Sequence, residues 1–199
     1  MEIKIFDRWS EKDLEVKDIG LKKYINLQPI MVPRSGGRYA KHQFHKSKMN
    51  IVERLMNKLA VPGHRGKKHV LTSGRASGKT LIHYKIVNSA FEKIEKQIGK
   101  NPIAILVGAI ENTAPREEIT AYQVGGMIMR RAVITSPQRR VDIALKNIAH
   151  SSYKKSFGKK ESMSGALANE LIAAYNNDAS KSEAVKERER LERESEGAR

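Results

Sequence analysis

Residues 119–148 decide the fold, and they read ITAYQVGGMIMRRAVITSPQRRVDIALKNI. Two runs of strand composition flank Gly125 and Gly126, and a Gly-Gly pair between such runs is a strong hairpin signal. A two-residue turn at these glycines pairs Val124 with Met127, and each step away from the turn pairs the next two residues. The sequence therefore predicts a two-stranded β-hairpin at about 117–134.

The predicted register determines where the ribbon carries its charge. It places Arg130 opposite Ala121 and Arg131 opposite Thr120. Because neighbouring residues of a strand point to opposite faces, the two arginines should cover both sides of the ribbon. A two-stranded ribbon is barely stable alone in water, so it should lean on helices or on a partner. The ribbon residues expected near a partner are Tyr122, Gln123, Gly125, Gly126, Arg130 and Arg131.

A helix should start directly after the ribbon. Ser136 suits the N-cap, and Pro137 suits the first helical position, where no N–H is needed. Arg139 and Arg140 then fall in the first turn, where cations oppose the helix dipole. This placement is more readily tolerated when the arginines meet an anion. Apolar residues follow at helical spacing and should form the buried stripe, namely Val141, Ala144, Leu145 and Ile148.

Composition limits the class of protein. The chain has 199 residues, enough for one or two domains, and its 39% apolar content supports one small core. Cysteine is absent, which excludes disulfides and thiolate metal sites. There is no apolar run of membrane-spanning length and no signal-peptide layout at the start. We therefore expect a soluble, intracellular protein that has no membrane partner.

The charge is strongly positive and unevenly distributed. The formal net charge is +16. Residues 21–100 hold 18 Lys/Arg against 3 Asp/Glu, and residues 101–160 hold 10 against 4. The two ends are slightly acidic. A confined excess of this kind, mixed with aromatic residues, indicates a polyanion partner, because each cation that meets a phosphate releases a counterion. The alternative is a soluble protein that is merely basic.

The pattern of apolar residues and helix breakers predicts a mainly α fold. We expect a single-domain bundle of five to six helices with the protruding hairpin, formed by residues 33–199, preceded by an N-terminal arm at 1–32 that is flexible. Leu21, Tyr24, Ile25 and Leu27 could pack this arm on the body. The predicted helices are one capped by Ser47 and ended by Pro62, and those at about 80–98, 103–110, 137–148, 163–175 and 180–195. The last is either a helix across the body or a frayed tail.

Two basic loops are candidate RNA-binding segments. Aromatic residues among cations can stack on exposed bases while the cations hold phosphates. Tyr39 could stack in this way or anchor its loop, and Phe44 is better explained as a core residue. We expect RNA contacts from four segments. The first loop contributes Arg34, Arg38, Tyr39, Lys41, Lys46 and Lys48, and the second contributes Arg65, Lys67, Lys68, Arg75 and Lys79. The helix start contributes Arg139 and Arg140, and a later polar stretch contributes Lys154 and Lys155.

Motifs for catalysis or metal binding are weak. The run from Gly74 to Thr80, GRASGKT, resembles a nucleotide-binding loop but has three residues between its glycines instead of four, and no strand precedes it. A Gly-Lys-Thr at a helix start can still hold a backbone phosphate through its N–H groups. His42 and His45 have metal-like spacing among lysines that would repel a cation. We therefore expect no enzymatic activity, no cofactor and no metal.

The chain resembles the family of the universal seventh protein of the small ribosomal subunit, in its archaeal and eukaryotic type. The likeness covers nearly the whole chain. Its ordered motifs are the runs that begin Gly37-Arg-Tyr-Ala, Ile51-Val-Glu-Arg-Leu, Ala90-Phe-Glu, Asn101-Pro, Pro115-Arg-Glu, Arg130-Arg-Ala-Val, Ser136-Pro-Gln-Arg-Arg-Val and Leu167-Ala-Asn-Glu-Leu. Strand 118–124 lacks the run of arginines typical of bacterial members, and the positive charge lies on the second strand instead.

This resemblance implies a function that composition alone does not. It implies a helical bundle with a β-ribbon that binds the 3′ major domain of small-subunit rRNA and nucleates assembly of the subunit head. It also implies a place at the subunit interface, near the exit-site tRNA and the mRNA path, beside other head and platform proteins, without homo-oligomers. From the residues alone, two alternatives stay open: a nucleotide-driven RNA remodeller that uses Lys79, and a sequence-specific DNA-binding protein with a ribbon reader.

Overall fold

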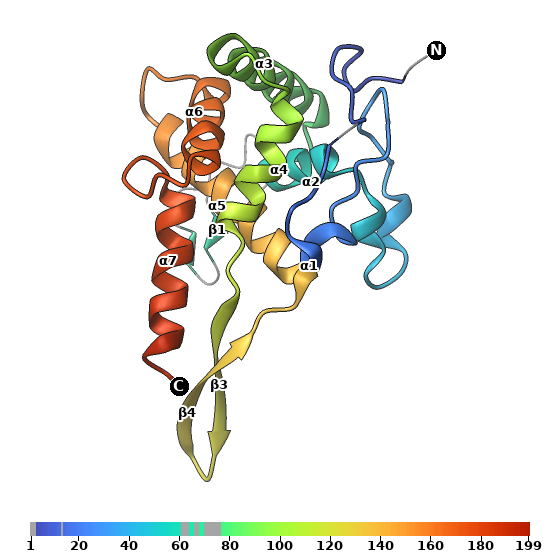
Figure 1. Ribbon diagram of the computed structural model, residues 1–199. Coiled ribbons are helices and arrows are strands. Elements are labelled where there is room, and N and C mark those ends of the chain that lie inside the picture. The colour runs from blue at the N-terminus through green and yellow to red at the C-terminus, as the bar shows by residue number, and fades with distance from the viewer. Residues whose placement is uncertain (1–2, 13, 61–63, 66–67, 70–76) are drawn as a thin grey trace.

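The computed structural model describes residues 3–12, 14–60, 64–65, 68–69 and 77–199. Within these residues the chain is a helical body with a β-hairpin that protrudes from one end (Figure 1). This confirms the predicted mainly α bundle with a hairpin. The described α-helices are α1 (Ile19–Lys22), α2 (Ile51–Leu59), α3 (Thr80–Ile98), α4 (Pro102–Thr113), α5 (Pro137–Ser156), α6 (Met163–Tyr175) and α7 (Glu183–Glu196).

The hairpin consists of β3 (Glu117–Val124) and β4 (Met127–Ile134), which are antiparallel. The register matches the prediction at every pair, from Val124 with Met127 to Glu117 with Ile134. The turn explains this agreement, because Gly125 and Gly126 have φ values of 54° and 88°. Positive φ at both central residues is what a tight hairpin turn of this kind requires, and glycine adopts it without strain.

Helix α4 lies at the centre of the core. Its N-cap, Asn101, accepts a hydrogen bond from the backbone N–H of Ile103, and Pro102 occupies the first helical position. The helix is buried on most sides by α3, α5, α6 and α7. A Cβ atom on Gly108 would lie 2.7 Å from the ring of Tyr175, at the end of α6. Glycine therefore permits the close approach of α4 and α6.

The described part of the predicted arm is packed into the same core. Ile5, Phe6 and Trp9 are buried, as are Leu21 and Ile25. The rings of Phe6 and Trp9 meet the ring of Phe91 of α3 edge to face, at centroid distances of 6.1 and 5.6 Å. Edge-to-face aromatic pairs add stability beyond the area that they bury. Residues near the start of the chain therefore complete the core rather than forming a loosely attached, flexible segment.

The first predicted helix starts later than expected. Its N-cap is Asn50, whose side chain accepts from the N–H of Val52, whereas Ser47 lies in the short 3-10 helix η2 (His45–Lys48). Met49 between them is extended, with ψ of 138°, and this interrupts the helix. Both side chains are capable caps, so sequence alone could not choose between them. The buried amide of Asn50 also donates to Glu11, at 2.7 Å, which fixes the choice.

At the other end of the chain, the segment left open as a helix or a frayed tail is helix α7. Ser182 caps it by accepting from the N–H of Val185. Figure 1 shows α7 running along the body toward the base of the hairpin, and it packs against α5 and β3. Among the described residues, no helix has both the length and the apolar composition needed to cross a membrane.

Candidate nucleic-acid interface

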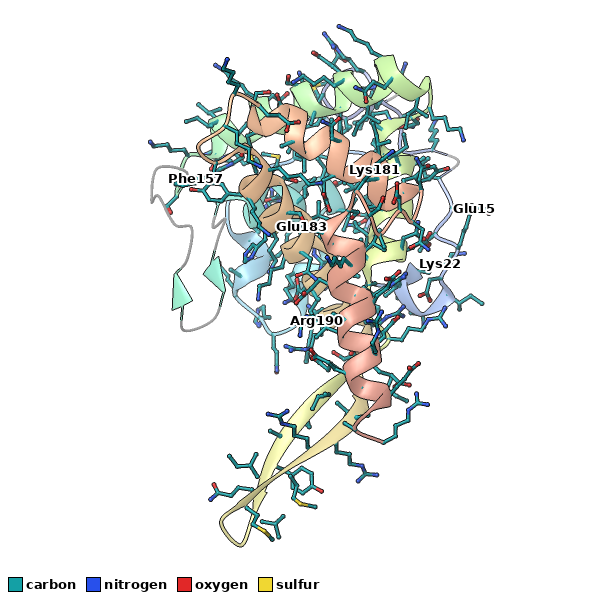
Figure 2. All side chains as sticks on the ribbon, turned by 90° about the vertical axis from the view of Figure 1, so that its left-hand side faces the viewer. Glu15, Lys22, Phe157, Lys181, Glu183 and Arg190 are labelled. Atoms are coloured by element: carbon teal, nitrogen blue, oxygen red, sulfur yellow. The ribbon has the colours of Figure 1, made fainter. Side chains whose placement is uncertain are left out.

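The outer half of the hairpin is exposed on both faces. Residues that pair across the ribbon or lie two apart share a face, so Tyr122 and Val124 stand beside Met127 and Met129. The opposite face carries Gln123 and Ile128, with Ile128 74% exposed. In Figure 2 the side chains of the ribbon stand away from the helical body on both sides. The tip is therefore an apolar surface without a covering layer in the described part of the chain.

The two ribbon arginines lie below this tip. Arg130 and Arg131 are both exposed, and they project from opposite faces of β4. Neither makes an ion pair within the described residues. A guanidinium that lacks an internal carboxylate keeps all of its donors for a phosphate.

Two ion pairs hold the base of the hairpin, one on each face. Arg139 of α5 forms a two-pronged ion pair with Glu118, in which Nη2 lies 2.7 Å from Oε2. Arg199, just after α7, donates to both oxygens of Glu117, at 2.5 and 2.7 Å. The hydrogen bonds that Arg139 donates to Glu118 raise the pKa of Arg139, and those that Glu117 accepts from Arg199 lower the pKa of Glu117. The hairpin is therefore held between α5 and the end of α7.

Arg140 links the hairpin end of the body to the arm. Its Nη2 lies 2.8 Å from Oδ2 of Asp18, and its Nε donates to the carbonyl of Pro115. Asp18 is also the N-cap of α1, since it accepts from the N–H of Gly20. Burial acts to raise the pKa of Asp18, but the hydrogen bond and charge of Arg140 outweigh it and hold that pKa below its usual value. The anions that Arg139 and Arg140 meet are carboxylates of the same chain.

The first basic loop, residues 34–48, presents exposed cations beside α2. Two short 3-10 helices, η1 (Arg38–Ala40) and η2, shape it, and Ser35 fixes its start by donating its N–H and hydroxyl to Glu53. Tyr39 is half-buried. The predicted contact residues Arg34, Arg38, Lys41, Lys46 and Lys48 are all exposed.

The prediction that Phe44 belongs to the core is wrong. Its side chain is 65% exposed. The chain turns sharply at Phe44, where φ is 65°, and this left-handed turn at the start of η2 leaves the ring outside the core. The first loop therefore offers an exposed aromatic ring among its cations.

Much of the second basic loop lies outside the described residues, including Lys67, Arg75 and the Gly74 end of the proposed phosphate loop. Arg65 and Lys68 pair in a two-residue ladder between β1 (His64–Arg65) and β2 (Lys68–His69). Lys79 is exposed at the N-cap of α3, after Gly78 with φ of 73°. The structure therefore places Lys79 at a helix N-terminus, as predicted.

Lys154 and Lys155 are engaged within the protein. Lys154 lies 2.8 Å from Glu183 at the start of α7. Lys155 lies 2.5 Å from the fully buried Glu170 of α6 and donates to the carbonyl of Lys181, at 2.6 Å. The second oxygen of Glu170 accepts from Ser182. A buried carboxylate needs such partners, so Lys155 joins α5, α6 and the start of α7.

A cation cluster that sequence reasoning missed surrounds Asp142 of α5. The guanidinium of Arg54 lies 3.2 Å from Oδ1, Lys58 lies 4.0 Å from the same oxygen, and Lys46 bonds Oδ2. Burial acts to raise the pKa of Asp142, but Lys46, Lys58 and Arg54 lower it further than burial raises it. Lys46 of η2 and the two cations of α2 come from neighbouring segments, and the fold brings them to Asp142 of α5, which is far away in sequence. The one local signal was the spacing of Arg54 and Lys58, one helical turn apart.

His42 and His45 lie together, with ring centroids 4.9 Å apart. In the part of the chain that the structure describes, no three side chains of His, Cys, Asp or Glu are grouped so that they could hold a metal ion.

Comparison with known proteins identifies the family. The model of the family described as ribosomal protein S7p/S5e matches residues 21–199. The chain belongs to this family. It is 47% identical over all of both chains to small ribosomal subunit protein uS7 of Nanoarchaeum equitans. It is 43% identical to the uS7 of Archaeoglobus fulgidus, over 100% of this chain and 96% of the relative. A third relative, the uS7 of Methanothrix thermoacetophila, is 41% identical over 99% of this chain and all of its own.

Membership confirms the resemblance read from the ordered motifs. The proteins of the S7p/S5e family are structural ribosomal proteins and not enzymes. The nucleotide-driven remodeller is therefore rejected.

Proposed function

We propose that this protein is a structural constituent of the small ribosomal subunit, binds the 3′ major domain of its rRNA directly and nucleates assembly of the head. The observation that carries this proposal is family membership together with exposed arginines on a protruding ribbon that form no ion pair with any other described residue. Such arginines are suited to phosphates, and the ribbon can reach between RNA helices that the body does not touch.

The mechanism is to hold folded RNA in one arrangement. The exposed cations of loop 34–48, Lys79 and the ribbon arginines neutralise phosphates of separate strands. Arg139 also takes part, because its side chain stays 59% exposed in its ion pair with Glu118. Tyr39 and Phe44 offer rings for unstacked bases. Lys154, whose side chain stays 51% exposed in its ion pair with Glu183, takes part in the same way as Arg139. Arg140 and Lys155 act mainly inside the protein, where they set the positions of the arm, the hairpin and α7.

A binding experiment tests the rRNA assignment. We expect the protein to bind a transcript of the 3′ major domain more tightly than a 5′ domain transcript of equal length, with affinity that falls steeply as salt rises. Chemical footprinting on the same transcript should show protection confined to a few neighbouring helices. Equal affinity for both transcripts, or for duplex DNA used as competitor, would contradict the proposal.

The finer location is also proposed from the family resemblance: the cytoplasmic small subunit, at the interface near the exit-site tRNA and the mRNA path, beside head and platform proteins. The exposed tip of the hairpin supports it, since a ribbon free of the body is able to reach these neighbours. The chain has no cysteine, so Gln123→Cys creates a single attachment point for a cross-linker. In reconstituted subunits, we expect cross-links from this position to mRNA or exit-site tRNA. Cross-links to rRNA alone would reject direct contact.

A further inference from the structure

The cluster around Asp142 has more positive charge than its one carboxylate can balance. We define the Asp142 cluster as Lys46, Arg54, Lys58, Asp142 and Lys146. Lys146 follows Asp142 by one helical turn of α5, and its charge acts on Lys58 together with those of Lys46 and Arg54. Four cations therefore share one anion. Within the described residues, no second carboxylate makes an ion pair with any of these cations.

The cations of the cluster differ in how many of their hydrogen-bond donors are already occupied within the protein. Arg54 has a side chain only 4% exposed, and its two terminal nitrogens are occupied by Asp142 and by the carbonyl of Tyr24, at 2.7 Å. Lys46 and Lys58 keep 50% and 39% of their side chains exposed. An ammonium group has three donors, and the carboxylate accounts for only some of them. The lysines therefore have donors that point away from Asp142.

Holding these lysines together is unfavourable without a second anion beside Asp142. Burial lowers the pKa of Lys58 and so do the charges of Lys46, Arg54 and Lys146, against the opposing effect of Asp142. The negatively charged nonbridging oxygens of a phosphodiester placed over the lysines would relieve this repulsion. Because Asp142 already restricts Lys46 and Lys58, less side-chain entropy is lost on binding.

We infer that the Asp142 cluster is a binding site for a phosphate of the RNA backbone, with Lys46, Lys58 and Lys146 as donors and Asp142 as a positioning residue. This inference rests on the proposed rRNA-binding function and assigns one contact to named side chains. It also joins the first basic loop to α2 and α5, so that one phosphate contact would depend on three separate elements of the fold.

The first experiment removes two of the donors. Lys58→Gln plus Lys146→Gln is compared with Lys85→Gln plus Lys96→Gln, which removes two exposed lysines of α3 and changes net charge equally. For the 3′ domain transcript, we expect the cluster variant to lower the slope of log affinity against log salt by about one to two and to weaken binding about tenfold. The α3 variant should change the salt slope and the affinity much less. Equal effects in the two variants would overturn the inference.

A second readout does not depend on rRNA. Binding of inorganic tripolyphosphate should raise the Tm of the wild-type protein, because a ligand of the native state stabilises it. We expect the rise to be clearly smaller in the cluster variant than in the α3 variant. If the wild-type protein failed to prefer the 3′ domain but kept this difference, the proposed function would fail and the phosphate site would stand. An unchanged rise in the cluster variant would reject the site itself.

The positioning role of Asp142 has its own test. Asp142→Asn makes the protein more positive, so simple attraction predicts tighter RNA binding. If Asp142 positions the lysines, binding should instead weaken several-fold. Glu95→Gln on α3 is the matched control, since it removes an exposed carboxylate outside the cluster and should leave affinity equal or slightly higher. Tighter binding by Asp142→Asn would reject the positioning role.

Discussion

Two pairs of adjacent arginines lie nine residues apart, and the structure uses them in opposite ways. Arg130 and Arg131 stand exposed on the ribbon without internal carboxylates in the described part of the chain. Arg139 and Arg140, at the start of α5, each meet a carboxylate of this chain. The sequence argument that arginines in a first helical turn need an anion was sound, but both anions are internal. The comparison teaches that a basic dipeptide keeps all of its donors for RNA only when the fold leaves it without acidic neighbours.

The largest expected contrast is in stability. Arg140→Ala should lower the free energy of unfolding by about 2 kcal/mol, because it removes charged hydrogen bonds to Asp18 and Pro115 at a site where the arginine is 12% exposed. Arg130→Ala should change it by less than about 0.5 kcal/mol, as exposed residues usually do. Urea titrations of the two variants would measure the difference. Equal losses of unfolding free energy in the two variants would contradict the view that Arg140 stabilises the fold and Arg130 does not.

The reverse contrast is expected in RNA binding. Arg130→Ala plus Arg131→Ala should weaken binding to the 3′ domain transcript about tenfold and lower the salt slope by about two. Arg139→Ala plus Arg140→Ala should also weaken binding and flatten the slope, but less, because only Arg139 stays well exposed. Filter binding over a range of salt would measure both. A larger slope change at the helix start would show that RNA displaces the internal carboxylates.

Acid should weaken the ion pair that Arg140 makes with Asp18 at the start of α5. It should not affect Arg130 and Arg131, which have no carboxylate partner in the described part of the chain. The pKa of Asp18 is lower in the folded protein than its usual value, so the folded state favours the carboxylate. This stability is fully present above the unfolded pKa of about 4 and is lost as pH falls through the folded pKa. Asp18→Asn should therefore be less stable than wild type near neutral pH, and it should lose less stability between pH 5 and pH 3. If the free energy of unfolding of wild type and of Asp18→Asn fell in parallel between pH 5 and pH 3, this account would be contradicted.

The smallest effect is expected at the base of the hairpin. Arg139→Ala should change the free energy of unfolding by less than about 0.5 kcal/mol, since the arginine is 59% exposed and such pairs are screened by solvent. It should nevertheless loosen the hairpin relative to the body. Spin labels on Gln123→Cys and Lys96→Cys would report this as a broader distance distribution than in the wild-type background. An unchanged distribution would mean that the packing of α7 and the ion pair between Arg199 and Glu117 are enough to hold the hairpin.

Local signals predicted the fold well. The hairpin register followed from Gly125 and Gly126, because a two-residue turn leaves only one pairing. Proline at 137 and the apolar stripe after it located the start of α5. The N-cap of α2 was harder to predict, because Asn50 and Ser47 are equally good N-cap residues by type and only the contact of Asn50 with Glu11 decides between them. The four-residue helix α1 is too short to give a periodic signal.

The candidate interface was predicted only in part, for a physical reason. Sequence shows which segments are basic, but not which cations a distant carboxylate neutralises. Asp142 and Lys46 are separated by 96 positions, and Arg140 and Asp18 by 122. The fold alone brings such residues together. The exposed position of Phe44 has a different, local cause: it depends on a single left-handed turn that no composition rule predicts.

The exposed hairpin has a consequence for the protein in isolation. Among the residues that the structure describes, no third strand pairs with the hairpin, so both outer edges of its tip carry unpaired backbone groups, next to Met127, Ile128 and Met129. An apolar open edge is a template for aggregation. Arg130 and Arg131 directly follow this run and act as gatekeepers, because their charges repel a second copy. The arginines suited to a phosphate partner would thus also keep the molecule dispersed before that partner arrives. Variants that lack them should precipitate at lower concentrations than wild type.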